Sequence, residues 1–216
     1  PEMSLATGIR VIILSIAAAV LSIVFCMSMQ IISKSFKKYL KNQYLRIFVG
    51  GLLLVLLTLA VRSNDYNGAG MNIIEQAIHG TARPEAFILK LLFTCITIGC
   101  GFRGGEIVPS FFIGATFGCT LGGWIGLDPG FGAAIGLVCL FCGVVNCPLA
   151  SLVLSIELFG ASGILLFAIG CSVSYMLSGY YSLYSEQKII YSKLRPHYVS
   201  LYTNQEVKTN DHTQQQ

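Results

Sequence analysis

Residues 11–32 read VIILSIAAAVLSIVFCMSMQII, and this run decides the class of the protein. Its only ionisable side chain is Cys26. Roughly 20 apolar residues are enough for a helix to cross about 30 Å of hydrocarbon. Over the whole chain, hydrophobic residues make up 54% and charged residues 11%, whereas a soluble domain has about a quarter charged residues. The sequence therefore predicts an integral membrane protein surrounded by lipid.

Outward from this run, apolar segments alternate with short polar gaps, and several are interrupted by Gly or Pro. Irregular backbone at membrane depth persists only where protein buries it or where it lines a cavity. We therefore predict an all-α polytopic membrane protein with short, broken and tilted helices. Helices are expected at residues 6–36, 45–61, 71–79, 86–100, 109–125, 131–145, 149–159 and 163–177, and an amphipathic segment at residues 180–194.

Charge is distributed unevenly between the polar gaps. The gap after the first helix contains five basic residues and no acidic residue: Lys34, Lys37, Lys38, Lys41 and Arg46. The next gap, residues 62–85, mixes both signs. The positive-inside rule then makes the first gap cytoplasmic and the amino end external. We expect a bacterial plasma-membrane protein with a cytoplasmic carboxy terminus, and we favour this interpretation of the lysines over nucleic-acid binding.

All eight cysteines lie in apolar segments. Cys139 and Cys142 form a C-x-x-C pair with Cys147 nearby, so a metal or redox site is one interpretation. Cysteine in a membrane helix is more often a small packing residue, and we expect no metal and no cofactor. The transmembrane domain is assigned to residues 1–200 and a polar, disordered tail to residues 201–216. Because the chain starts at Pro1, we expect it to be a fragment of a longer protein.

The stretch with the clearest chemistry is residues 104–109, Gly-Gly-Glu-Ile-Val-Pro. Pro109 suits the first turn of a helix, where a missing N–H costs nothing. Glycines before it let the backbone turn so that free N–H groups point into a cavity. The start of a helix carries about half a positive charge and can therefore bind an anion. The alternative is a helix-starting loop without a ligand.

The run GFRGGEIVPSFFIGATFG, followed by Asn146-Cys147-Pro148-Leu149 and Ile156-Glu157, resembles the carboxy-terminal half of the CLC family of chloride channels and proton-coupled anion transporters. That family has a G-x-F-x-P motif before a helix, which here is the five residues from Gly105 to Pro109 with Ile107 in place of Phe. It also has a tyrosine near the start of its last helix, and Tyr184 matches that place.

The resemblance implies one half of a CLC-type inverted repeat, in a homodimer that pairs through the late helices. It implies that the backbone around Gly105, Glu106, Ile107 and Val108, with the hydroxyl of Tyr184, binds the central anion. The first-half motifs of the family, including its gating glutamate, have no counterpart here. A complete pathway therefore needs the other half or another chain.

Glu106 and Val108 bear on which anion is carried. A carboxylate beside an anion site is costly unless it is protonated, paired or turned away, and Arg103 is the nearest candidate partner. A glutamate at this place is similar to the fluoride-exporting branch, which tends to have Thr where this chain has Val108. Chloride is therefore the expected ion and fluoride the alternative.

We therefore predict transmembrane transport of small inorganic anions by a channel or a proton-coupled antiporter. The alternative from a different functional class is a non-transporting half-unit that needs a partner. No combination of residues indicates an enzyme active site. Glu157, in a short helix after Pro148, is read first as a buried structural carboxylate. A proton-path residue and a residue near an interface are the alternatives.

Overall fold

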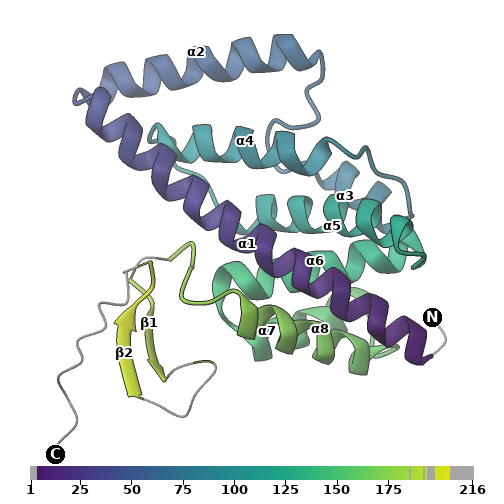
Figure 1. The fold of residues 1–216 in the computed structure, drawn as a ribbon. Helices are drawn as coiled ribbons and strands as arrows, with labels where there is room; N and C mark the ends of the chain where they lie inside the picture. The colour runs from purple at the N-terminus through teal and green to yellow at the C-terminus, as the bar shows by residue number, and fades with distance from the viewer. Residues whose placement is uncertain (1–3, 185, 192, 194–197, 205–216) are drawn as a thin grey trace, which may run out of the picture.

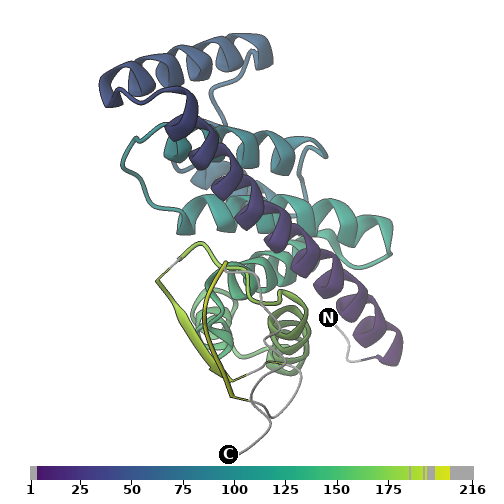
Figure 2. The same cartoon turned by 60° about the vertical axis from the view of Figure 1, so that its left-hand side comes forward.

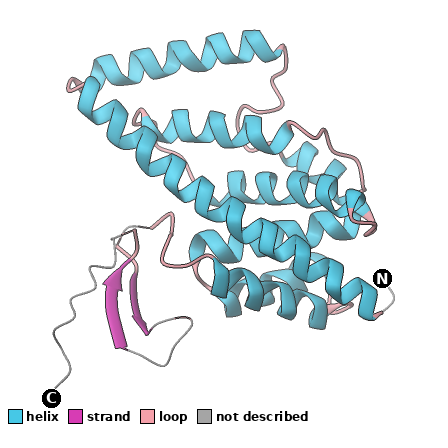
Figure 3. Ribbon diagram, in the orientation of Figure 1, coloured by secondary structure: helices cyan, strands magenta, loops and turns pink. Residues whose placement is uncertain are grey.

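The computed structural model describes residues 4–184, 186–191, 193 and 198–204. In this part of the chain, eight helices precede a two-stranded antiparallel hairpin (Figures 1 and 3). In order they are α1 (Leu5–Tyr39), α2 (Gln43–Val61), α3 (Met71–Ile78), α4 (Ala86–Gly99), α5 (Ile107–Trp124), α6 (Pro129–Val145), α7 (Pro148–Phe159), α8 (Ile164–Leu177), β1 (Lys188–Tyr191) and β2 (Tyr198–Tyr202).

The long helix α1 crosses the other helices at an angle (Figures 1 and 2). It packs against α4, α5, α6 and α8. Its inner face is built largely from small residues, including the buried Ser15, Ala18, Ala19 and Ser22. Small side chains let helix backbones approach closely where no hydrophobic force drives them together. The predicted crossing run therefore forms one wall of the bundle.

Three of the described helices, α1, α2 and α5, are long and apolar enough to cross a membrane. Helices α4, α6, α7 and α8 are apolar but shorter. Helix α2 contacts α4 and buries only Gly50 among its residues. Its apolar side chains, such as Phe48 and Leu59, are exposed. This face is suited to lipid or to another protein segment.

The break between α6 and α7 falls at Asn146-Cys147-Pro148, as the sequence predicts. Asn146 ends α6 in the left-handed conformation (φ 58°), which Asn tolerates better than most residues. Its side-chain amide donates to the carbonyl of Tyr181 at 2.8 Å. Pro148 then occupies the first turn of α7. The two short helices are therefore separated by a defined corner.

Two differences from the sequence prediction bear on the candidate site. Helix α5 starts at Ile107, so Pro109 is its third residue rather than its first. The described residues of this segment, 180–184, 186–191 and 193, do not form the last helix that the resemblance implies. Instead, a loop leads into β1, in which Ile189 is buried and Ile190 is exposed. This alternation, with β-branched side chains, favours a strand over a helix.

Residues 201–204, which the sequence assigned to the polar tail, are held by contacts with the preceding loop. Thr203 is buried and its hydroxyl donates to the carbonyl of Tyr184 at 2.5 Å. The side chain of Asn204 bonds the backbone of Ser182 through both its oxygen and its nitrogen. These contacts order the first residues after β2. Residues 205–216 lie outside the described part of the chain.

Candidate anion site

The start of α5 is the centre of the candidate site. Glu106 is its N-cap, and its side chain makes no capping hydrogen bond. The first turn of a helix has no carbonyl one turn earlier to accept its N–H groups. Since Pro109 has no N–H, the free amides of this turn belong to Ile107 and Val108. The first bond to the cap runs from the Ser110 amide to the Glu106 carbonyl, at 3.1 Å.

The loop before α5 is fixed at one end and open at the other. Arg46 of α2 donates through Nε to the carbonyl of Cys100 at 3.1 Å. Gly101 adopts a φ of +106°, which side-chain-bearing residues rarely adopt. Gly104 and Gly105 have no such φ, and a Cβ added at either would meet nothing within 4 Å. These two glycines therefore leave the backbone accessible. The turn itself does not require glycine at either position, which corrects the expectation from the sequence.

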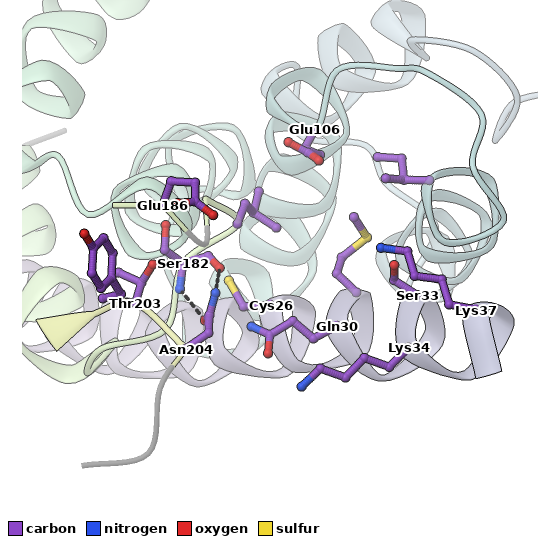
Figure 4. A pocket seen from close by; sticks show the side chains of 14 residues that line it. Cys26, Gln30, Ser33, Lys34, Lys37, Glu106, Ser182, Glu186, Thr203 and Asn204 are labelled. Carbon is purple, nitrogen blue, oxygen red and sulfur yellow. Dashed lines mark hydrogen bonds between the residues drawn. The ribbon is translucent and has the colours of Figure 1, made fainter. Parts of the chain in front are cut away.

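Glu106 lines a cavity of about 610 Å³, named here the Glu106 cavity (Figure 4). Its walls come from α1, from the end of α4, from the start of α5, from the segment between α8 and β1, and from the end of β2 with the two residues after it. Charged side chains on both sides face it: Lys34, Lys37, Glu106 and Glu186. Its polar, uncharged lining includes Gln30, Ser33, Ser182, Thr203 and Asn204.

A second cavity of about 360 Å³, the Lys90 cavity, lies on Gly104, Gly105, Val108 and Pro109. Lys90 of α4 is 2% exposed. Its ammonium donates to the carbonyls of Tyr66 at 3.2 Å and Gly68 at 2.6 Å. It also lies 4.9 Å from the ring centroid of Phe112. A buried cation thus faces the same space as the glycines before α5.

The two cavities meet at the start of α5. Glu106 lines one, and Val108, two residues on, lines the other. Ile98 of α4 lines both and so belongs to the wall between them. The start of α5 therefore lies where the two cavities approach each other.

Tyr184 lies in the loop between α8 and β1, and its side chain is 39% exposed. The residues just before it, Ser182 and Leu183, line the Glu106 cavity, while the side chain of Tyr184 is not part of that lining as described. Bonds from Ser182 Oγ (3.1 Å) and the Leu183 amide (3.0 Å) to the Val144 carbonyl fasten this loop to the end of α6. The loop therefore lies beside the cavity that contains Glu106.

The two other ionisable candidates are exposed. Arg103 is exposed in the loop before α5. Glu157 is exposed on α7 between the exposed Ile156 and Leu158. A buried structural position for Glu157 was expected, and the structure differs because α7 turns its small residues Ser151 and Ser155 inward.

Sequence reasoning missed several residues that line these cavities. Lys90 carried a signal, because it is the only charged residue in an otherwise apolar helix, and such groups are costly in a membrane. The sequence patterns used Lys34 and Lys37 only to predict which side of the membrane this gap faces. Gln30, Ser182 and Thr203 had no signal, since their placement depends on contacts between distant segments.

With this geometry in view, comparisons with known proteins are informative. The family model described as voltage gated chloride channel matches residues 1–179. The chain belongs to this family, the CLC proteins. The resemblance inferred from the sequence is therefore confirmed, as is the predicted all-α polytopic membrane fold.

Individual relatives agree with this. A "chloride/fluoride channel protein" of Pseudomonas syringae pv. tomato is 39% identical over 163 residues, which cover 73% of this chain and 36% of the relative. An uncharacterized protein of Methanocaldococcus jannaschii is 25% identical over 151 residues, 68% of this chain and 38% of the relative. The crystal structure of a CLC-type fluoride/proton antiporter matches with a TM-score of 0.82 and 29% identity, over 85% of this chain and 47% of that one. The chain thus spans less than half the length of each.

Proposed function

We propose that this CLC chain forms part of a pathway that carries small inorganic anions across a membrane. The observation that carries the proposal is the start of α5, where free amides stand between the Glu106 cavity and the Lys90 cavity. Backbone amides can replace part of the water around a halide without placing a fixed cation at that point. Lys90 adds positive potential on the side of the Lys90 cavity. Its side chain is 2% exposed, and its ammonium donates to two backbone carbonyls.

Fluoride and chloride are the candidate ions. Val108 cannot donate a side-chain hydrogen bond, which favoured chloride over fluoride in the sequence analysis. The names of the Pseudomonas relative and of the solved antiporter both include fluoride, and this supports fluoride as a second candidate. A halide has no directional bonding demand, so the same amides could hold either ion.

Glu106 is the candidate for proton coupling. Its carboxyl group faces the same cavity as two lysines and shares no capping bond with α5. A protonated carboxyl group next to the α5 amides would tolerate a passing anion, whereas an ionised one would repel it. Antiport of a halide and a proton is therefore the proposed mode, with channel behaviour as the alternative.

We also propose a homodimer through the late helices, in a bacterial plasma membrane, with the carboxy terminus in the cytoplasm. Helices α7 and α8 expose apolar side chains that another copy could cover: Leu149, Val153, Ile156, Leu158, Ile164, Leu165, Met176 and Leu177. The lysines between α1 and α2 support the orientation through the positive-inside rule.

The test is anion flux in liposomes that contain the complete protein of which this chain is part. Chloride, fluoride and a pH gradient should be compared in the same vesicles. We expect halide efflux that depends on the pH gradient, and we expect Tyr184→Ala to weaken halide binding. If the folded complete protein moves neither halide, the chain is better described as a non-transporting half-unit.

A further inference from the structure

The last turns of α1 present two different faces. One face lines the Glu106 cavity and includes Lys34 and Lys37. The other face, together with Ile96 of α4, lines a separate cavity of about 300 Å³, named here the Tyr39 cavity. The end of α1 and the residue after it contribute five residues to this cavity: Ile32, Ser35, Phe36, Tyr39 and Leu40. Their spacing of three and four places them along one side of a helix.

The lining of the Tyr39 cavity is suited to hydrocarbon. No charged residue belongs to the lining as described, and four of its six side chains are aliphatic or phenyl groups. The end of α4 lies directly against α1 beside it, since a Cβ added at Gly99 would come within 2.8 Å of Ile32 Cγ2. Tyr39 is 78% exposed, so the cavity reaches the surface of the described chain at the end of α1. Tyrosine is enriched at this depth in membrane proteins, where its ring meets acyl chains and its hydroxyl meets head groups.

The charges next to the Tyr39 cavity are positive. Lys38 Nζ lies 5.9 Å from the centroid of the Tyr39 ring. Lys41 follows two residues after Tyr39, and both lysines are exposed. The sequence has no acidic residue between Glu2 and Asp65, so no carboxylate of this stretch neutralises the two ammonium groups. Basic clusters beside a membrane-crossing helix attract anionic lipids.

We propose that the Tyr39 cavity, with Lys38 and Lys41, is a binding site for one anionic phospholipid at the end of α1. An acyl chain occupies the apolar cavity, and the phosphate accepts hydrogen bonds from the two ammonium groups. The cavity favours a lipid over a free phosphate ion, and the lysines favour an anionic lipid over a zwitterionic one. The site uses a different face of α1 from the Glu106 cavity, so it does not depend on the proposed function.

The first test removes the two charges, as Lys38→Gln with Lys41→Gln. The complete protein in neutral detergent is titrated with phosphatidylglycerol or phosphatidylcholine, and bound lipid is counted by native mass spectrometry. The dissociation constant for phosphatidylglycerol should rise at least about fivefold, the factor expected for one lysine at an anionic lipid, while that for phosphatidylcholine stays the same. The control is Lys34→Gln with Lys37→Gln, which removes the same charge from the face of α1 that lines the Glu106 cavity. It should change phosphatidylglycerol binding less than about twofold.

The second test fills the Tyr39 cavity without changing charge, as Ile96→Trp. Binding of both lipids should weaken about tenfold, the factor expected when roughly two methylene groups of the acyl chain lose their burial. The matched control is Ile88→Trp on the same helix, because Ile88 is 58% exposed and does not line the cavity as described. This control should leave both dissociation constants unchanged. Glycerol phosphate, which has a head-group phosphate and no acyl chain, should not displace phosphatidylglycerol from the wild type.

Each result decides for or against the site. Equal losses in the two lysine pairs would mean that diffuse surface charge attracts the lipid, and displacement by glycerol phosphate would mean that the phosphate alone binds. Wild-type binding of both lipids by Ile96→Trp would mean that another part of the complete protein covers the cavity. Any of these three results would overturn the inference. If Ile96→Trp does not elute as a folded protein, the lysine pairs decide, and a loss limited to Lys38 and Lys41 would support the site.

Discussion

The two ends of the glycine pattern around α5 differ sharply in their surroundings. At Gly104 and Gly105, an added Cβ would meet nothing within 4 Å. At Gly118, it would come within 2.2 Å of the Gly132 carbonyl oxygen of α6. Gly104 and Gly105 expose backbone to a cavity, whereas Gly118 lets the backbones of α5 and α6 touch. One residue type therefore serves access before the helix and close helix packing within it.

Close packing along α5 explains how the helix can begin at a polar site inside an apolar bundle. Gly114, Gly118 and Gly122 place α5 directly on Gly132 and Gly136 of α6. This close contact fixes the helix over its length, so its first turn needs no further support from side chains. The unbonded amides of Ile107 and Val108 then lie between Glu106, which lines one cavity, and Pro109, which lines the other.

The largest effect is expected at the crossing of α5 and α6. Gly118→Leu would force α5 away from α6, because the new Cβ would lie 2.2 Å from the Gly132 carbonyl oxygen and this backbone atom cannot move aside. We expect a loss of at least about 3 kcal/mol of stability, at the upper end for overpacked sites, and little folded protein on size exclusion in detergent. The control is Gly123→Ala on the same helix, where the nearest atom is Pro129 Cγ at 3.7 Å. Equal yields of both variants would show that the glycine face is not essential.

The next effect is expected at the buried cation beside the open glycines. Lys90→Met removes the donor to the carbonyls of Tyr66 and Gly68 and leaves both without it. We expect about 2 kcal/mol of lost stability, together with faster proteolysis within residues 62–70. Lys41→Met, at an exposed lysine, serves as the control. Unchanged cleavage in Lys90→Met would mean that the loop is held by other contacts.

A smaller effect is expected at Val108, which lines the Lys90 cavity together with Gly104 and Gly105. Val108→Thr adds a hydroxyl donor to the Lys90 cavity. An added hydrogen bond of about 1 kcal/mol would change the ratio of fluoride to chloride flux about fivefold in favour of fluoride, the stronger acceptor. The measurement is flux of each halide in parallel liposomes. A ratio equal to that of the wild type would indicate that this side chain does not reach the ion.

A pH-dependent effect is expected in the segment that follows the last helix. Burial lowers the pKa of Lys193 to about 8 from 10.5, and its ammonium donates to the Tyr175 carbonyl at 2.9 Å. Between these pKa values the unfolded chain binds more protons than the folded one, so stability rises with pH across this window. The wild-type melting temperature should therefore rise from pH 7 to pH 10 relative to that of Lys193→Met. A constant difference would contradict the shifted pKa.

Much of the fold could be predicted from the sequence, because lipid leaves few choices for apolar segments. The long run at residues 11–32 and the break between helices at Asn146 follow from local pattern and spacing. The hairpin β1–β2 was missed. The residues of β1 belong to the segment 180–194, which was predicted to be amphipathic, and the family resemblance favoured a helix there.

The site was only partly predictable for a different physical reason. The motif from Gly105 to Pro109 is continuous in the chain, so its helix start could be found from residue types alone. The cavities are formed by residues far apart in the sequence, such as Gln30, Lys90 and Ser182. Their polar side chains gain meaning only when α1, α4 and the loop after α8 come together.

The most direct test of the central claim is an NMR titration of one backbone amide. Glu106–Ile107 is the only Glu-Ile pair in this sequence, so carbonyl-labelled glutamate with nitrogen-labelled isoleucine isolates the Ile107 N–H in this chain. In the complete protein, we expect this signal to shift saturably as halide is added, and a non-binding anion should leave it in place. A folded, transporting protein in which the Ile107 amide does not respond to halide would contradict the account.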